Sequence, residues 1–160
     1  MNKRQSKEFY YLGIADSVCE RSTCLRKKYG AIIVRNDEII STGYNGAPRG
    51  RKNCVDLGSC ERNRLNIPSG ERYELCRSVH AEANAIISAS RRDMIGATLF
   101  LVGRDAVSGA LLESSVPCSM CKRLIINAGI DRVVMQSGKD SFISVETKDW
   151  IENDDSLIGI

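Results

Sequence analysis

Apolar residues between positions 5 and 21 recur every three or four residues, with charged residues between them. The apolar positions are Phe9, Leu12, Ala15 and Val18 or Cys19. This spacing places them on one face of a helix. We therefore expect a surface helix that packs against the core through that face.

Two short segments with strand-forming residues follow this helix. Residues 30–34 form a continuous apolar segment, and residues 38–43, which include Ile39 and Ile40, follow the pair Asn36-Asp37. Short runs rich in β-branched residues predict strands, and Asn-Asp between two such runs favours a tight turn. We predict an antiparallel hairpin as the first piece of a sheet.

Residues 44–78 lack sustained periodicity and are rich in Gly, Pro, Asn, Arg and Cys. A loop of this length without secondary structure of its own is uncommon inside a compact domain. We call this Cys-rich segment the insert, and we expect an additional interaction to hold it in place.

The second half of the chain alternates helices and strands. Residues 81–89 are alanine-rich and predict a helix, and a second helix is expected from Pro117 to a stop at Gly129. Residues 97–102 and 131–135, each with a run of apolar residues, predict strands. This alternation predicts a parallel core with right-handed crossovers and helices on both faces.

The pattern weakens after Gly138. Residues 142–145 are consistent with a fifth strand, and residues 149–155 with a short polar helix. The expected fold is therefore of the α/β class: a three-layer α-β-α sandwich with a mixed five-stranded sheet that begins with an antiparallel hairpin.

Length and composition narrow the class of protein. The 160 residues suit a single domain, 1–160, and 42% apolar with 27% charged residues is ordinary for a globular protein. No apolar run approaches the length of a membrane span or follows the basic N-terminus, so we expect a cytoplasmic protein. In that compartment the seven cysteines indicate metal ligands rather than disulfides.

Charge and aromatic content argue against a polynucleotide partner. The net charge is only +3, and three Phe, five Tyr and one Trp offer few platforms for base stacking. A single nucleotide needs only a local basic pocket. We expect no nucleic-acid partner and no membrane partner.

The residues that carry chemistry fall in two segments. His80, the only histidine, stands two residues before Glu82, and Cys118 and Cys121 lie three positions apart behind Pro117. One imidazole and two thiolates supply three zinc ligands and leave the fourth tetrahedral position for water, as in catalytic zinc sites. A C-x-x-C pair alone is also typical of structural zinc sites or redox pairs, and a lone histidine is often only hydrogen-bonded.

His-x-Glu followed by Pro-Cys-x-x-Cys resembles the signature of the zinc-dependent cytidine and deoxycytidylate deaminase superfamily. The resemblance implies the cytidine deaminase type of sandwich, a catalytic zinc held by His80, Cys118 and Cys121, and Glu82 as the catalytic proton carrier. In that chemistry, activated water attacks C4 of the pyrimidine and ammonia leaves.

Further segments resemble deoxycytidylate deaminases in particular. They are Cys24-Leu25-Arg26 with Gly30 to Val34, Ser41 to Pro48, and Asn84-Ala85-Ile86. The resemblance implies hydrolysis of dCMP to dUMP with release of ammonia, a reaction that supplies dUMP for thymidylate synthesis.

The same resemblance suggests contacts with the substrate. It implies that Asn45 hydrogen-bonds the deoxyribose hydroxyl and that Ala81 lies at the substrate, although Asn-Gly is also simply a favoured turn pair. Arg26 is our candidate for the 5′-phosphate, because a guanidinium can bind two phosphate oxygens at once. The competing interpretations are a solvated basic surface and the other cations Lys27, Lys28 and Arg49.

Regulation and assembly are implied only by the resemblance. In relatives, the region that corresponds to Gly43, Tyr44 and Gly46 takes part in binding regulatory deoxynucleoside triphosphates across a hexamer. We therefore expect dCTP and dTTP as regulators, Mg²⁺ with the regulatory nucleotide, and a homo-oligomer.

Five cysteines lie outside the expected catalytic set. We hypothesise that Cys24, Cys54, Cys60 and Cys76 bind a second, structural zinc that orders the insert, with Cys19 as a spare or alternate ligand. The resemblance supports this hypothesis, because some deoxycytidylate deaminases carry a second zinc at matching places, although their remaining ligands differ. The alternative is that these cysteines are small buried apolar residues.

Two other functions remain open at this point. One is deamination of a different cytosine or adenine substrate: a nucleoside, a free base or tRNA. The other is a zinc-stabilised nucleotide-binding module without chemistry. Glu82 argues against the module, because a structural zinc site needs no residue to carry protons.

Overall fold

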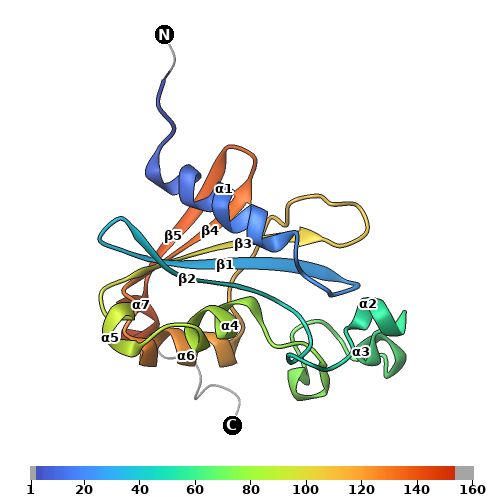
Figure 1. Ribbon diagram of the computed structural model, residues 1–160. Helices are drawn as coiled ribbons and strands as arrows, with labels where there is room; N and C mark the ends of the chain where they lie inside the picture. Colours follow the sequence, from blue (N-terminus) through green and yellow to red (C-terminus); the bar gives the residue numbers. More distant parts are fainter. Residues whose placement is uncertain (1–2, 154–160) are drawn as a thin grey trace.

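The computed structural model describes residues 3–153, which form a twisted sheet with helices on both faces (Figure 1). The strands are β1 (Lys27–Arg35), β2 (Glu38–Tyr44), β3 (Thr98–Asp105), β4 (Arg132–Gly138) and β5 (Ser141–Glu146). Their spatial order is β2-β1-β3-β4-β5. The predicted mixed five-stranded sandwich is confirmed.

The first hairpin forms as its turn residues dictate. Asn36 and Asp37 both adopt positive φ angles, 50° and 62°, the conformation that a tight two-residue hairpin turn requires. Gly30 pairs with Tyr44 at the far end of the antiparallel β1–β2 ladder. Both strands are longer than predicted, because the polar residues at their ends also join the ladder.

The predicted parallel core is smaller than expected. β2, β3 and β4 do run in the same direction, but β1 lies between β2 and β3 and is antiparallel to both. Only β3 and β4 are parallel neighbours among the described strands. The alternation of helices and strands along the sequence indicates the direction of each strand. It does not reveal that β3 pairs with β1 and not with β2.

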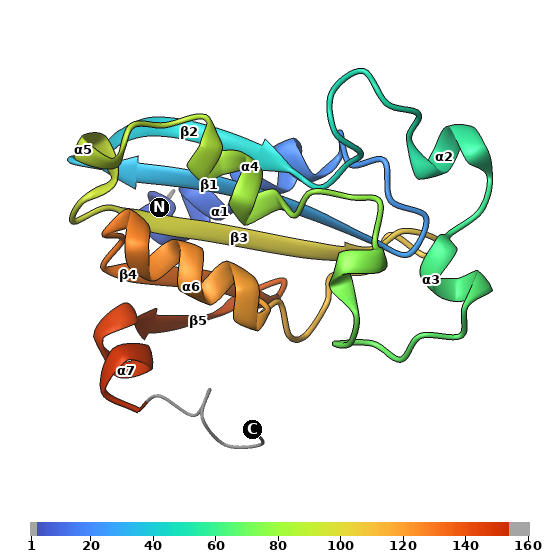
Figure 2. The same ribbon diagram turned by 90° about the horizontal axis from the view of Figure 1, so that it is seen from below.

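The helices divide into two layers (Figures 1 and 2). Helix α1 (Lys7–Cys19) covers one face, where Leu12 and Ala15 pack against β1 and β3. The other face carries α4 (Ala81–Ile87), α5 (Arg91–Met94), α6 (Ser119–Ala128) and α7 (Thr147–Glu152). Ala85 and Ile125 are fully buried in the core cluster of that face.

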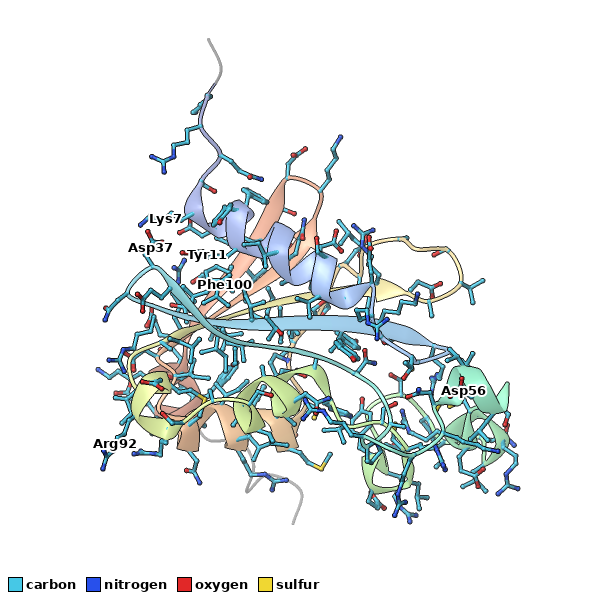
Figure 3. The ribbon with its side chains drawn as sticks, in the orientation of Figure 1. Lys7, Tyr11, Asp37, Asp56, Arg92 and Phe100 are labelled. Atoms are coloured by element: carbon cyan, nitrogen blue, oxygen red, sulfur yellow. The ribbon has the colours of Figure 1, made fainter. Side chains whose placement is uncertain are left out.

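Helix α1 is anchored at the hairpin tip as well as on the sheet. Its Lys7 forms an ion pair of 3.1 Å with Asp37, and the Tyr11 hydroxyl donates a hydrogen bond to the same carboxylate. The Tyr11 ring also lies 5.1 Å from the Phe100 ring of β3, measured between centroids (Figure 3). The predicted surface helix is present and packs on the core through Leu12 and Ala15 as expected, with Tyr11 added to the buried face.

The insert contains short elements that the sequence pattern did not predict. They are α2 (Cys54–Leu57), α3 (Glu61–Arg64) and the 3₁₀ turn η1 (Tyr73–Leu75). In Figure 2 the insert lies beyond the end of the sheet where β2 and β3 terminate. The insert therefore lies at the end of the sheet where α4 and α6 begin, next to the predicted zinc ligands.

Two predicted boundaries differ from the structure. Helix α6 begins at Ser119, so Pro117 precedes the helix and Cys118 is its N-cap residue; its carbonyl accepts the first helical hydrogen bond, from Lys122 N at 2.9 Å. The C-terminal helix predicted to reach Asp155 ends at Glu152 as α7, and residues 154–160 lie outside the described part of the chain. No helix in residues 3–153 combines the length and apolar character needed to cross a membrane.

The close approach of α1 to β1 predicts that Gly30 cannot carry a side chain. A Cβ at this position would lie 2.1 Å from the Ala15 carbonyl oxygen and 2.4 Å from the Cys19 nitrogen, both backbone atoms. Gly30→Ala should lower the free energy of unfolding by about 3 kcal/mol, measured by urea denaturation.

Gly13→Ala serves as the matched control. Gly13 lies in helix α1 and is exposed, and a Cβ added there would meet no atom within 4 Å, so alanine should stabilise the protein by about 0.5–1 kcal/mol. Equal stability of the two variants would contradict the proposed packing.

Candidate zinc centre and nucleotide pocket

Two helix N-termini meet at the end of the sheet. His80 is the N-cap residue of α4, and its carbonyl accepts a hydrogen bond from Asn84 N at 3.0 Å. Cys118 holds the same position in α6, and Cys121 lies in the first turn of that helix. The sequence thus places all three predicted ligands at the positive ends of helices, where a thiolate is favoured over a thiol.

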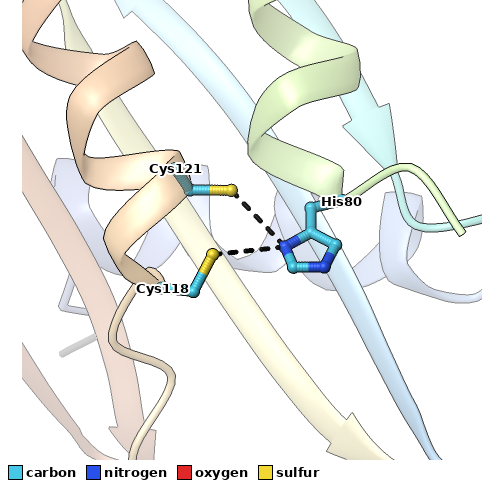
Figure 4. Close-up of side chains that lie close together, drawn as sticks. All are labelled: His80, Cys118 and Cys121. Atoms are coloured by element: carbon cyan, nitrogen blue, oxygen red, sulfur yellow. Dashed lines mark hydrogen bonds between the residues drawn. The ribbon is translucent and has the colours of Figure 1, made fainter. Parts of the chain in front are cut away.

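The three ligand atoms converge (Figure 4). The Nδ1 atom of His80 lies 3.5 Å from the sulfur of Cys118 and 3.5 Å from the sulfur of Cys121. Zinc bonds to nitrogen and sulfur at tetrahedral angles place such atoms about 3.5 Å apart. This geometry and donor set fit zinc, and His80, Cys118 and Cys121 form the zinc-binding site of the chain.

The electrostatics of the site favour metal binding. A hydrogen bond from the Cys121 thiol and the neighbouring His80 imidazole lower the pKa of Cys118 to about 4, which stabilises its thiolate. The hydrogen bond with Cys118 also raises the pKa of His80 above its ordinary value. Cys121 keeps the proton of the thiol pair, because its hydrogen bond with Cys118 raises the pKa of its own thiol, and zinc takes the place of that proton.

Glu82 lies beside the three ligands in the first turn of α4. Its side chain is 6% exposed, and no lysine or arginine among the described residues forms an ion pair with it. Burial raises the pKa of its carboxyl group above the ordinary range. A buried carboxyl group with a raised pKa holds a proton more readily than an exposed one, which suits it to accept and return a proton.

A pocket opens from the zinc ligands toward the insert. Its lining includes His80, Glu82 and Cys118 at one end and Arg26, Lys27, Tyr29 and Asn45 from the segments around β1 and β2. The insert contributes Cys54, Cys60, Arg62, Tyr73 and Cys76. The pocket therefore combines a metal centre, a buried carboxyl group and several cations.

Comparison with known proteins agrees with this arrangement. The family model for the cytidine and deoxycytidylate deaminase zinc-binding region matches residues 5–137. This chain belongs to that deaminase family. The match covers both zinc-ligand segments and the insert between the first hairpin and α4.

Individual relatives support the same family. The chain is 42% identical to the deoxycytidylate deaminase of Mycobacterium phage D29 over 131 residues, which cover 78% of this chain and 90% of the relative. It is 34% identical to the deoxycytidylate deaminase of Schizosaccharomyces pombe over 82% of this chain, but only 37% of that longer relative is covered.

Solved structures of a cyanophage protein match the fold. The apo form of dCMP deaminase from cyanophage S-TIM5 superposes with a TM-score of 0.59 at 27% identity, covering 86% of this chain and 88% of that chain. A second structure of that enzyme, in complex with dCMP and dUMP, gives a TM-score of 0.53 at 26% identity and covers 82% and 83%. The deaminase fold is therefore shown by structure as well as by sequence.

Asn45 lies in the pocket, and its side chain also ties the fold together. Its Oδ1 accepts hydrogen bonds from Ser22 Oγ at 2.5 Å and from Tyr29 N at 2.8 Å, and its Nδ2 donates to the Lys27 carbonyl at 2.9 Å. One amide hydrogen remains for another acceptor. The predicted contact with deoxyribose is compatible with this geometry and stays a prediction.

The structure separates the candidate phosphate ligands. Arg26 and Lys27 line the pocket, whereas Lys28 and Arg49 are not part of its lining. Nη1 of Arg26 is buried and has no hydrogen-bond partner among the described residues. An unpartnered guanidinium nitrogen in a pocket is the expected condition of a group that binds an anion supplied from outside.

The predicted regulatory and substrate residues near α4 have structural roles. A Cβ at Gly43 would lie 2.4 Å from both Ala81 O and Ala85 N, so glycine is required for β2 and α4 to pack this closely. Gly46 pairs with Val79, immediately before His80. Tyr44 is half-buried beneath Arg21, and Ala81 is fully buried. Their proposed roles toward nucleotides stay predictions.

The remaining cysteines gather without forming a closed site. The four predicted ligands Cys24, Cys54, Cys60 and Cys76 all line the pocket. Burial, followed by the charges of its three thiol neighbours, raises the pKa of Cys54. Within residues 3–153, however, His80, Cys118 and Cys121 are the only metal-type cluster with ligand atoms all within 4.8 Å of one another. Cys19 is buried at the end of α1, outside the pocket.

Sequence reasoning missed Arg62 and Tyr73. Both lie in the insert, which lacks periodicity, and both line the pocket. The only available signal was weak: Tyr73 is the one aromatic residue between Tyr44 and the zinc ligand His80.

Proposed function

We propose that this protein is a zinc-dependent deaminase that hydrolyses dCMP to dUMP and ammonia. The observation that carries the proposal is the combination of a His80–Cys118–Cys121 zinc site and buried Glu82 with the unpartnered guanidinium of Arg26 in one pocket. The phage relative at 42% identity is a deoxycytidylate deaminase, and the cyanophage relative was solved with dCMP and dUMP. Both support a nucleoside monophosphate as the substrate.

The residues of the chain divide the work of the reaction. Zinc, when bound, supplies a Lewis acid that makes water a nucleophile near neutral pH. Glu82 accepts a proton from the water that attacks C4 and delivers it to N3 of the cytosine ring. Glu82 then takes the remaining proton from the new hydroxyl on C4 and passes it to the amino group; the C4–N bond breaks, ammonia leaves and the hydroxyl oxygen becomes the C4 carbonyl. Burial of Glu82 supports this role, because its raised pKa brings proton gain and loss closer to neutral pH.

Binding of the substrate follows from the rest of the pocket. Arg26, with Lys27 beside it, receives the 5′-phosphate, and Asn45 offers its remaining amide hydrogen to the deoxyribose hydroxyl. The backbone around Ala81, at the start of α4, supports the base next to Glu82. The overall role is the supply of dUMP for thymidylate synthesis.

We also propose the regulation and assembly that the family resemblance implies. dCTP and dTTP, with Mg²⁺, would bind near Gly43, Tyr44 and Gly46 in a homo-oligomer. Exposed apolar side chains on the α4 and α6 layer support an oligomer: Ile87, Met120 and Leu124. Pairing of Gly46 with Val79 would transmit an effect at this loop to His80, since Val79 directly precedes that ligand.

Glu82→Gln should retain one catalytic zinc per chain and lose turnover of dCMP by at least about 100-fold, because the amide cannot carry a proton. His80→Ala should lose both the zinc and the turnover. Metal content by mass spectrometry and ammonia release measure the two effects separately. A Glu82→Gln enzyme that kept most of its rate would show that another group carries the proton.

Substrate choice is tested by ammonia release from dCMP, CMP, deoxycytidine, cytosine and adenosine-containing RNA. We expect dCMP to be turned over fastest. In Arg26→Met, kcat/KM for dCMP should fall by about 10 to 100-fold while kcat/KM for deoxycytidine is unchanged, because only dCMP carries the phosphate.

Lys28→Met is the matched control for Arg26→Met, since Lys28 is a neighbouring cation that does not line the pocket. It should leave both substrates unaffected. Equal losses on dCMP and deoxycytidine in Arg26→Met would contradict the phosphate role, and rapid turnover of RNA or an unphosphorylated substrate would contradict the choice of dCMP.

We propose further that Cys24, Cys54, Cys60 and Cys76 close around a second zinc, which draws the four pocket-lining thiols together. The segment before β1 already bonds to the insert: Val55 N donates to the Thr23 carbonyl at 3.3 Å, and Thr23 Oγ1 donates to Asn53 Oδ1 at 3.0 Å. These bonds hold Cys24 and Cys54 in neighbouring segments.

Purified wild-type protein should therefore contain two zinc ions per chain, and Cys60→Ser should contain one. Cys19→Ala, which changes a buried thiol outside the pocket, should still contain two. One zinc per chain in the wild type, unchanged when Cys54 and Cys60 become serine, would rule out the second site.

A further inference from the structure

Arg62, on α3 of the insert, is unusual because it is charged and almost fully buried. It is 6% exposed, and no carboxylate of the described residues forms an ion pair with it. A buried cation without a counter-ion is costly and rare in proteins, so it requires a local reason. The exposed neighbour Arg64 forms the ordinary surface pair, with Glu61.

Arg62 contacts two backbone carbonyls of the insert and one aromatic ring. Its Nη2 donates to the carbonyl of Pro68 at 2.7 Å and to the carbonyl of Glu71 at 2.8 Å. Its guanidinium carbon lies 4.6 Å from the centre of the Tyr73 ring. The arginine therefore fixes the loop between α3 and η1 and stacks on Tyr73 from the side of α3.

Tyr73 in turn contacts the zinc ligand His80. The two ring centroids are 5.0 Å apart with an interplanar angle of 88°, the edge-to-face arrangement that aromatic pairs prefer. Both rings line the pocket beside Glu82 and Cys118. A continuous line of contacts thus runs from the insert to the metal centre.

The hydrogen bonding of His80 explains why its ring needs a packing contact such as the one with Tyr73. A histidine that binds a metal through one ring nitrogen usually donates a hydrogen bond from the other, which fixes the orientation of the ring. In His80, Nδ1 faces the two cysteine sulfurs, and within residues 3–153 the other ring nitrogen has no protein hydrogen-bond partner. The edge-on contact with Tyr73 restrains the ring from the insert side.

We propose that Tyr73, held by Arg62, is a positioning residue for the zinc ligand His80, so that the insert builds part of the catalytic centre. The Tyr73 ring holds the imidazole by packing in place of a hydrogen bond, and Arg62 holds the ring. The proposal rests on the zinc role of His80 and does not depend on which pyrimidine is the substrate.

Because His80 is the only histidine, its imidazole nitrogens can be followed by ¹⁵N NMR without interference. The zinc-loaded protein is titrated with a chelator, and the signal of metal-bound Nδ1 reports occupancy of this site alone. We expect Tyr73→Ala to lose zinc from His80 at a chelator concentration at least about 10-fold lower than the wild type requires. The same variant should lower kcat for dCMP more than it changes KM. Tyr73→Phe should behave as the wild type, because the ring and not the hydroxyl makes the contact.

Arg62→Met should shift the titration in the same direction as Tyr73→Ala, and Arg64→Met, on the same helix, should shift nothing. Retention of zinc and of kcat in Tyr73→Ala would overturn the proposal. A Tyr73→Phe variant as defective as Tyr73→Ala would also overturn it, since the hydroxyl would then be the group that acts. The NMR readout holds even if dCMP is not the substrate, so failure of the proposed activity is distinguishable from failure of the positioning role.

Discussion

The catalytic centre depends on a single geometric constraint: two helices must begin at the same end of the sheet, close enough for their N-cap residues to share a metal ion. His80 and Cys118 occupy equivalent N-cap positions in α4 and α6, and each carbonyl accepts the first hydrogen bond of its helix. The direction of each side chain is therefore fixed by helix geometry and not by a flexible loop.

Contacts with the sheet keep the starts of α4 and α6 at this distance from each other. Gly43 lets α4 approach β2 to backbone contact, and the Ser41 hydroxyl donates to the Ala85 carbonyl at 2.7 Å across the same contact. Helix α6 is held by Ile125, which is fully buried in the core of that face. At the outer end, Asn84 Nδ2 donates to the Tyr44 carbonyl at 2.8 Å and ties the start of α4 to the end of β2. Loss of any of these contacts would move one zinc ligand relative to the others.

Much of this arrangement was predictable from sequence because its signals are local. The Asn36-Asp37 pair indicated the hairpin, and Gly129 indicated the end of α6. The spacing of His80, Cys118 and Cys121 indicated the metal, and the resemblance of these residues and Glu82 to the deaminase signature implied the chemistry. The position of β1 between β2 and β3 was not predictable in this way, since strand order depends on which edges pair across long stretches of chain. Arg62 and Tyr73 were missed for a related reason: their contacts are set by the tertiary path of an irregular segment that carries no period.

The position of β1 between β2 and β3 has a consequence for how the chain folds and varies. Ile32 pairs with Thr42 in its own hairpin but also with Phe100, far along the chain, so the sheet is completed only after the insert and α4 have been looped out. The entropy lost on closing a flexible loop grows only with the logarithm of its length, about 0.6 kcal/mol for each doubling. Lengthening or shortening the insert would therefore change the stability of the sheet very little. The central ladder therefore tolerates changes in the length of the segment that forms the outer wall of the pocket, provided that the residues which contact the zinc ligands are kept.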